Sequence, residues 1–377
     1  MLGSVLVTGG AGFIGSHLVD ALVDRGARVR VLDNLDAQVH GNGGGPELIA
    51  EHVRSDRVEF LRGDVRDPDM VDRALEGVDA VFHQAAAVGV GQSMYRIADY
   101  VASNSLGAAV LLERIIARDQ PLEKMVVASS MSIYGEGKYE CPSHGTVHPG
   151  LRSEEQFRRG QWEVECPECG AEMSPMPTDE AKRIEPTSVY AITKRDHEEL
   201  FLTVGDAYEI PTVALRYFNV YGPRQSLDNP YTGVAAIFTS RLLNDQPPIV
   251  FEDGQQSRDF VHVSDIARAN LLALESDEAN GRAYNVGTGR RLNLLQMIDA
   301  LRDHLGGPEP EIVGEFRKGD IRYCYADVSR ISEDLGFEAR VPFEDGIDDL
   351  ASWASEEEPA DRVEQATEEL KTAGLTV

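Results

Sequence analysis

The sequence predicts an α/β protein with a doubly wound parallel sheet, followed by a smaller α/β region. Two observations predict this fold. Short apolar runs, each long enough for one buried strand, alternate with helical patterns over the first 220 residues. A glycine-rich turn directly follows the first run and opens a helix. Runs buried on both faces and separated by crossover helices are typical of a parallel sheet covered on both sides.

The strands are expected at six apolar runs, which are 4–9, 28–33, 57–64, 78–85, 124–130 and 212–218. From about residue 220 the alternation breaks into loops rich in proline and glycine, as expected of a smaller domain that completes a cleft. We therefore predict a first domain over 1–220, with an insert at about 136–180. A second domain over 221–377 would be mainly substrate-binding, with the chain crossing back to the first domain.

Composition limits the possible partners. The 377 residues include 64 acidic and 36 basic side chains, a formal net charge of −28. Such an excess of carboxylates argues against nucleic acid as a partner. No apolar run approaches the ~20 residues that span a bilayer, and the N-terminus lacks the basic and then apolar pattern of a signal peptide. We expect a cytoplasmic protein with no membrane partner.

The glycine-rich turn "TGGAGFIG" predicts a dinucleotide site. Gly9, Gly12 and Gly15 have no side chains that would keep the backbone from a pyrophosphate, and the helix N-terminus attracts its charge. Asp33 ends the second expected strand, where a carboxylate can accept hydrogen bonds from an adenosine ribose and would repel a 2′-phosphate. The combination favours NAD over NADP. Asp64 and Val65 end the third strand near the expected adenine; the alternative is a loop aspartate beside a core valine.

"SVYAITK" places Tyr190 and Lys194 four residues apart. On a helix this spacing puts both side chains on one face, where an ammonium group stabilises phenolate over phenol. We therefore expect Lys194 to draw the pKa of Tyr190 toward neutral pH. The pair alone could belong to an ordinary surface helix, but here it accompanies Ser130 and the NAD motif.

Together these motifs resemble the extended short-chain dehydrogenases/reductases, the NAD-dependent epimerase/dehydratase family. The resemblance extends from the start of the chain to about residue 330 and includes "HQAAAV", "SSMSIYG", "RYFNVYGPR" and "RDFVHVSD". It implies a Rossmann-like fold, a bound nucleotide-diphosphate sugar and a homodimer formed through helices near 93–118 and 190–205. It assigns catalysis to Ser130, Tyr190 and Lys194.

The resemblance also assigns binding residues. Further cofactor contacts would come from Phe13, Ile14, Asn34, Gln84, Ala85, Ala86 and Asn104, together with Tyr190 and Lys194. The substrate would contact Ser130, Met131, Asn219, Phe251, Arg258 and Arg317. Phe251 would stack on the nucleotide base, and the two arginines would bind the diphosphate, whose oxygens suit planar guanidinium donors.

The residues after Ser130 distinguish between reactions of the family. Its 4,6-dehydratases carry Asp-Glu there, since elimination of water needs an acid and a base. This chain has Met131 and Ser132, so elimination is disfavoured, whereas a 4-epimerase needs neither group. The resemblance is to 4-epimerases of a dTDP-6-deoxyhexose such as dTDP-L-rhamnose. The alternatives are a UDP-glucose/UDP-galactose 4-epimerase and, in another class, a non-catalytic NAD-binding sensor.

Four residues of the insert predict a metal site. Cys141 and His144 form a Cys-x-x-His pair, and Cys166 and Cys169 form a Cys-x-x-Cys pair, with proline and glycine around both as in zinc knuckles. In a reducing cytoplasm such grouped cysteines suggest metal rather than disulfide. We predict a closed structural zinc site; the alternatives are free thiols or a redox pair.

Overall fold

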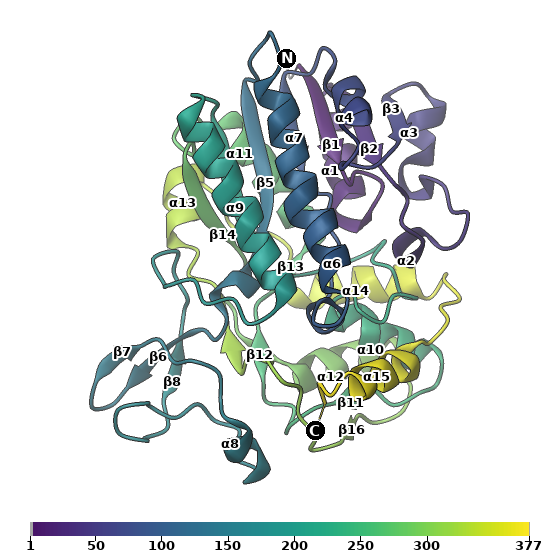
Figure 1. The fold of residues 1–377 in the computed structure, drawn as a ribbon. Helices are drawn as coiled ribbons and strands as arrows, with labels where there is room; N and C mark the ends of the chain where they lie inside the picture. Colours follow the sequence, from purple (N-terminus) through teal and green to yellow (C-terminus); the bar gives the residue numbers. More distant parts are fainter. Residues whose placement is uncertain (1–2, 377) are drawn as a thin grey trace.

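The computed structural model describes residues 3–376 and has a seven-stranded parallel sheet at its centre (Figure 1). The strand order is β14-β9-β5-β4-β1-β2-β3. The strands are β1 (Ser4–Thr8), β2 (Arg28–Asp33), β3 (Val58–Arg62), β4 (Ala80–His83), β5 (Lys124–Ser130), β9 (Thr212–Tyr217) and β14 (Arg282–Val286). All six expected strands are present. The seventh, β14, was not predicted, because Arg282 and Asn285 interrupt its short apolar pattern.

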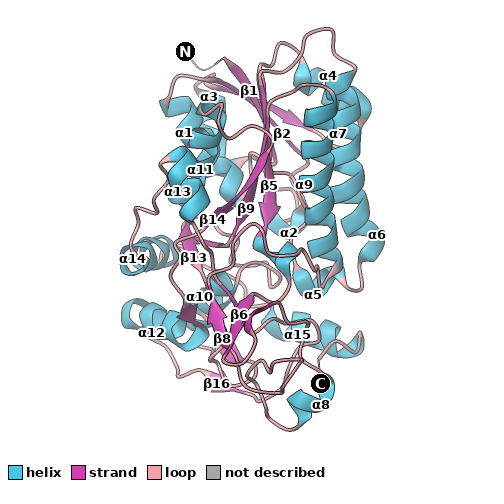
Figure 2. Cartoon of the chain, turned by 90° about the vertical axis from the view of Figure 1, so that its left-hand side faces the viewer, coloured by secondary structure: helices cyan, strands magenta, loops and turns pink. Residues whose placement is uncertain are grey.

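Helices cover both faces of the sheet, as Figure 2 shows from the side. One face carries α1 (Phe13–Asp24), α11 (Val263–Glu275) and α13 (Ser329–Leu335), and the other carries α4 (Pro68–Leu75), α7 (Gly107–Ile116) and α9 (Val189–Ala207). Each layer buries its apolar stripe against the sheet, through Leu18 and Ile266 on the first face and Leu111 and Phe201 on the second. The predicted doubly wound α/β fold is confirmed.

The second region packs around its own apolar core below the sheet. Tyr221, Phe260 and Phe343 lie in that core. Its helices are α10 (Val234–Leu243), α12 (Leu294–Leu305) and α14 (Phe343–Ala354). Two pairs of strands are β10 (Asn219–Tyr221) with β13 (Phe260–His262) and β11 (Ile249–Val250) with β16 (Glu311–Ile312). A three-stranded sheet has β12 (Ser257–Arg258) between β15 (Leu292–Asn293) and β17 (Tyr323–Cys324). The chain crosses back to the first region through α11, β14 and α13.

The remaining elements are short. They are α2 (Ala37–His40), η1 (Glu47–Ile49), α3 (Ala50–Arg54), α5 (Val90–Ser93), α6 (Ile97–Tyr100), a π-helical segment η2 (Val101–Leu106), η3 (Met131–Tyr134) and α15 (Val363–Thr372). The insert contains β6 (Lys138–Cys141), β7 (Gly145–Val147), α8 (Glu154–Arg158) and β8 (Ser174–Met176), and it projects beside the second region (Figure 1). Within residues 3–376, no helix has the length and apolar character needed to cross a membrane.

Candidate active site

A cavity of about 640 Å³ lies at the carboxyl edge of the sheet, between the two regions. Ligands of doubly wound proteins bind at this edge, where strand order reverses. The cavity extends from the glycine-rich turn to Phe251 in the second region. Every residue predicted above to bind cofactor or substrate, or to act in catalysis, lines this cavity, with Asn104 as the exception.

The glycine-rich turn approaches other backbone so closely that side chains are excluded. A Cβ on Gly15 would lie 2.1 Å from the Gly9 carbonyl oxygen, and Gly9 itself has a φ of +70°. Helix α1 begins after Gly12, and no side chain caps it. No capping side chain therefore competes with a ligand for the first N–H groups of the helix. Asp33 accepts hydrogen bonds from the backbone N–H groups of Ala11 (3.0 Å) and Leu35 (2.9 Å). The turn thus has the shape and the donors that a pyrophosphate requires.

The expected adenine end is formed by the loops after β2 and β3. The Asp64 carboxylate accepts two hydrogen bonds from the Arg66 guanidinium, at 2.8 and 2.6 Å, and one from Asn34 at 3.4 Å. The Arg66 hydrogen bond is the main cause that lowers the pKa of Asp64. Val65 is buried. Both residues line the cavity, and Val65 also belongs to the apolar core on that face of the sheet, so the adenine contact stays a prediction.

Ser130, Tyr190 and Lys194 meet in the middle of the cavity. Ser130 ends β5 and caps η3, and its Oγ accepts hydrogen bonds from the Ser132 N–H (3.2 Å) and hydroxyl (2.9 Å). Tyr190 and Lys194 lie one turn apart on α9, with exposed fractions of 8% and 4%. The Lys194 ammonium donates to the Ala128 carbonyl at 2.7 Å.

Burial controls the titration of both α9 residues. It raises the pKa of Tyr190 to about 12, although the Ser130 hydroxyl acts to lower it. Burial also lowers the pKa of Lys194 to about 7. The expectation that Lys194 draws the pKa of Tyr190 toward neutral is therefore wrong for the protein alone. Removing water from the phenolate raises the pKa more than the nearby groups lower it, so the phenol is the resting form.

Asn104 lies behind the cavity wall, in the π-helical segment. Its carboxamide accepts from the Ala87 N–H (2.7 Å) and donates to the Ala87 carbonyl (3.1 Å) and the Thr193 hydroxyl (2.9 Å). These contacts tie the loop after β4 to α9 one residue before Lys194. The geometry thus gives Asn104 a role in positioning this loop, and its direct contact with the cofactor stays a prediction.

Two buried histidines, which sequence reasoning missed, lie next to Lys194. His197 Nδ1 is 3.4 Å from the Lys194 ammonium, and the His197 ring lies 4.9 Å from that of His83. His83 in turn is hydrogen-bonded to the Thr8 hydroxyl at 2.8 Å. Burial lowers the pKa of His83 to about 3, so it is neutral. The i,i+3 spacing of Lys194 and His197 was the available signal.

The second region supplies the far end of the cavity. The Arg317 guanidinium lies 4.0 Å from the centre of the Phe251 ring, a cation–π contact. Arg258 donates to the carbonyl oxygens of Ser257, Ile321 and Arg322, at 2.9, 2.7 and 3.0 Å. Asn219 Oδ1 is buried without a hydrogen-bond partner among the described residues. Arg317 and Asn219 thus retain unpaired polar atoms, whereas the Arg258 guanidinium is largely occupied by backbone.

Met131 and Ser132 lie at the predicted position beside Ser130. The Met131 side chain is 7% exposed, packs against the core and lines the cavity. The Ser132 hydroxyl donates to Ser130. Neither side chain can act as the carboxylic acid or carboxylate that elimination requires.

Cys141, His144, Cys166 and Cys169 converge in the insert, with ligand atoms all within 4.8 Å of one another. The Cys141 and Cys169 sulfurs are 3.7 Å apart, and His144 Nδ1 is 3.5 Å from the sulfurs of Cys141 and Cys166. A tetrahedral zinc with bonds of about 2.3 Å to sulfur and about 2.0 Å to nitrogen separates its ligands by roughly 3.8 Å and 3.5 Å. The cysteines are free thiols, and their arrangement fits a four-coordinate metal.

Comparisons with known proteins agree with this geometry. The family model described as "NAD dependent epimerase/dehydratase family" matches residues 5–154 and 167–287, so its gap lies inside the insert. A dTDP-L-rhamnose 4-epimerase of Burkholderia thailandensis is 35% identical over 94% of this chain and 95% of its own length.

Similar solved structures are also nucleotide-sugar 4-epimerases. A UDP-glucose 4-epimerase of Thermotoga maritima, solved with UDP-glucose, is similar with a TM-score of 0.75 and 31% identity over 94% of this chain and 99% of that one. A UDP-glucose 4-epimerase of Thermus thermophilus, solved with NAD, has a TM-score of 0.72 and 32% identity over 93% of this chain and 99% of that one.

Proposed function

This chain belongs to the NAD-dependent epimerase/dehydratase family, and we propose that it inverts C4 of a dTDP-linked 6-deoxyhexose such as dTDP-L-rhamnose. It is an NAD-dependent nucleotide-sugar 4-epimerase by family, an isomerase. The observation that carries the finer assignment is the active-site triplet Ser130-Met131-Ser132, which joins a catalytic serine to an apolar neighbour in the cavity wall.

Each of these cavity residues would have a separate role in the epimerisation at C4. The turn from Gly9 to Gly15 and Asp33 would hold NAD, which would supply hydride transfer from C4 and back to it. Tyr190, in its phenolate form, takes the proton of the C4 hydroxyl and gives it back after the sugar has exchanged faces. Ser130 hydrogen-bonds the C4 oxygen while its charge changes. Lys194, when protonated, would stabilise the Tyr190 phenolate electrostatically and so favour the first transfer.

The sugar and the nucleotide are inferred from opposite ends of the cavity. Met131 presents an apolar surface beside Ser130, which suits a C6 methyl group better than a hydroxymethyl group. Phe251 and Arg317 would hold the base and the diphosphate, and Asn219 would contact the substrate through its unpaired Oδ1. The alternative is a UDP-glucose/UDP-galactose 4-epimerase, which the Thermotoga maritima relative supports.

Two other activities are less well supported. A 4,6-dehydratase would need an acid and a base where Met131 and Ser132 stand. A non-catalytic NAD-binding sensor has no need for Ser130, Tyr190 and Lys194 to converge in one cavity.

We further propose that the insert holds one structural zinc through Cys141, His144, Cys166 and Cys169. The ligand separations match a tetrahedral site, and three thiolates and an imidazole suit a borderline-soft cation. Four protein ligands leave no position open for water, so the metal would order the insert and take no part in the reaction.

A homodimer would use the helical face formed by α6, η2 and α9, which pack against one another. Ile97, Val101 and Ile192 expose 52%, 43% and 46% of their surface on these elements. An apolar face of this kind is stabilised when a second copy covers it. Light scattering should give twice the chain mass, and Ile97→Glu with Ile192→Glu should give monomers.

The substrate assignment is tested by incubating the protein separately with dTDP-L-rhamnose, UDP-glucose and UDP-galactose. Proton NMR resolves the C4 epimers, which have equal masses. The proposal expects conversion of the dTDP-6-deoxyhexose without added NADH. Faster conversion of the UDP-hexoses would support the alternative substrate, and stoichiometric consumption of NADH would indicate a reductase.

A further inference from the structure

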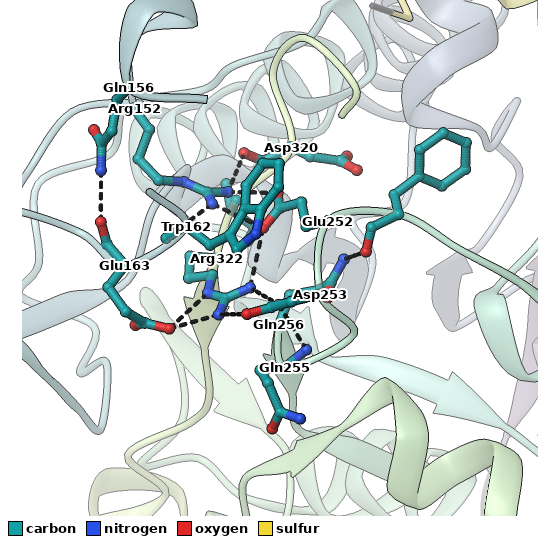
Figure 3. A network of polar contacts seen from close by, with 12 residues as sticks. Arg152, Gln156, Trp162, Glu163, Glu252, Asp253, Gln255, Gln256, Asp320 and Arg322 are labelled. Carbon is teal, nitrogen blue, oxygen red and sulfur yellow. Dashed lines mark hydrogen bonds and ion pairs between the residues drawn. The ribbon is translucent and has the colours of Figure 1, made fainter. Parts of the chain in front are cut away.

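Two buried arginines join the insert to the loop that carries Phe251 (Figure 3). Arg152 of the insert forms a bidentate ion pair with Glu252, at 2.8 and 2.9 Å, and the side chains are only 1% and 2% exposed. Arg152 also donates to the Trp162 carbonyl at 2.8 Å and the Asp320 carbonyl at 3.4 Å. One guanidinium therefore bridges the insert, the Phe251 loop and the segment that follows Arg317.

Arg322 makes a second bridge to Glu252, at the Oε2 atom that Arg152 also contacts. Its guanidinium is fully buried and contacts Glu252 (3.0 Å), Asp253 (2.6 Å) and Glu163 of the insert (2.5 Å). Bidentate and charge-assisted hydrogen bonds of this kind fix orientation as well as distance. Figure 3 shows the Arg322 guanidinium between Glu163 of the insert and Asp253.

The backbone of the Phe251 loop depends on these contacts. Glu252 has a φ of +55°, in the left-handed region that residues other than glycine avoid, and it directly follows Phe251. The Glu252 carboxylate is the group that forms ion pairs with both Arg152 and Arg322. Gln256 closes the same loop by donating to the Phe251 carbonyl at 2.9 Å. A non-glycine residue keeps such a conformation only when its surroundings hold it there.

A third connection reaches Arg258. The buried Glu136 carboxylate, at the start of the insert, accepts from the N–H groups of Arg322 (2.8 Å) and Tyr323 (2.8 Å). The carbonyl oxygens of Ile321 and Arg322 then accept the Arg258 guanidinium. The segment 321–323, whose N–H groups at Arg322 and Tyr323 donate to Glu136, therefore sets the orientation of Arg258.

We infer that Glu136 and Arg152 of the insert, together with Arg322, are positioning residues for the nucleotide end of the active site. They hold Phe251 and Arg258, and through the Phe251 ring Arg317, in the arrangement that receives a nucleoside diphosphate. The inference rests on the proposed function for the location of the nucleotide. It assigns the insert a role in substrate affinity that is exerted through ion pairs, separate from the chemistry at Tyr190.

The test compares nucleotide affinity with turnover in the full-length protein carrying NAD. Titration calorimetry with dTDP, and separately with UDP, measures the nucleotide end without the sugar. Arg152→Met should raise the dissociation constant at least tenfold, and KM should rise in parallel while kcat falls less than threefold. Arg152→Lys keeps the charge but loses the paired contacts, so it should restore part of the affinity.

Two controls separate positioning from general damage. Arg268→Met removes one partner of the Asp265 carboxylate, which is 2% exposed and lies on α11, away from the cavity. It should destabilise the fold but leave the dissociation constant for dTDP within twofold of the wild type. Arg158→Met removes an exposed arginine of the insert that pairs with Glu154, and it should behave like the wild type.

A double variant keeps the test decisive if Arg152→Met alone fails to fold. Arg152→Met with Glu252→Met leaves neither charge of the pair unpaired, and Arg322 retains Glu163 and Asp253. It should fold and still bind dTDP at least tenfold more weakly. Wild-type affinity in this folded variant would overturn the inference. Since the titration involves no turnover, a wild-type chain that binds dTDP but epimerises no sugar nucleotide would refute the proposed function alone.

Discussion

The buried Lys194 should lower the free energy of unfolding of the NAD-free protein at neutral pH, and Lys194→Met should restore the lost stability. Burial lowers the pKa of Lys194 from 10.5 to about 7. Since one pH unit corresponds to about 1.4 kcal/mol, charging this lysine in the folded state costs about 4–5 kcal/mol relative to the unfolded chain. The cost is absent above pH 10.5, grows as the pH falls toward 7 and is complete below 7. Methionine fills a similar volume and carries no charge.

The assay is thermal and urea unfolding of NAD-free wild type and Lys194→Met between pH 6 and pH 10. The variant should be more stable by several kcal/mol at pH 6–7, and the difference should shrink steadily toward pH 10. Lys371→Met changes a lysine that is 48% exposed, and it should alter the free energy of unfolding by less than about 0.5 kcal/mol at every pH. A Lys194→Met protein that is less stable than the wild type across the whole range would refute the reasoning.

Three further predictions concern the reaction and the metal. Tyr190→Phe should lower kcat by about two to four decades, the range of general acid–base catalysis, while NAD remains bound; activity near that of the wild type would contradict the proposed proton transfer. Incubation with dTDP-glucose or UDP-glucose should give no product lighter by one water in mass spectra, because Met131 and Ser132 cannot serve as acid and base; accumulation of a 4-keto-6-deoxy sugar would show that another group does. Protein purified without a metal-binding tag should contain about one equivalent of zinc, and Cys166→Ser with Cys169→Ser should remove the zinc and raise KM while NAD binding persists; less than about a tenth of an equivalent in fully active, reduced protein would exclude the zinc site.

Features that depend on neighbouring residues in the chain were predictable. The six strands follow from apolar runs, and the dinucleotide turn follows from three glycines and Asp33. Tyr190 and Lys194 share a helix face because they are four residues apart. The clustering of three cysteines and His144 in the insert follows from two x-x pairs, since each tight turn can present two side chains together. The predictions failed where a weak local pattern was completed by distant contacts, as in β14, whose place in the sheet comes from pairing with β9.

By itself, the sequence determined which chemical groups are present and how each is spaced along its own strand, turn or helix. Only the tertiary structure decided their environment: that burial raises the pKa of Tyr190, that Asn104 lies behind the wall, and that backbone carbonyls occupy Arg258. It also decided that Arg152 and Glu252, a hundred residues apart, form a buried pair. Solvent exclusion and ion pairing depend on every element that packs around a group, and local spacing carries no record of those elements.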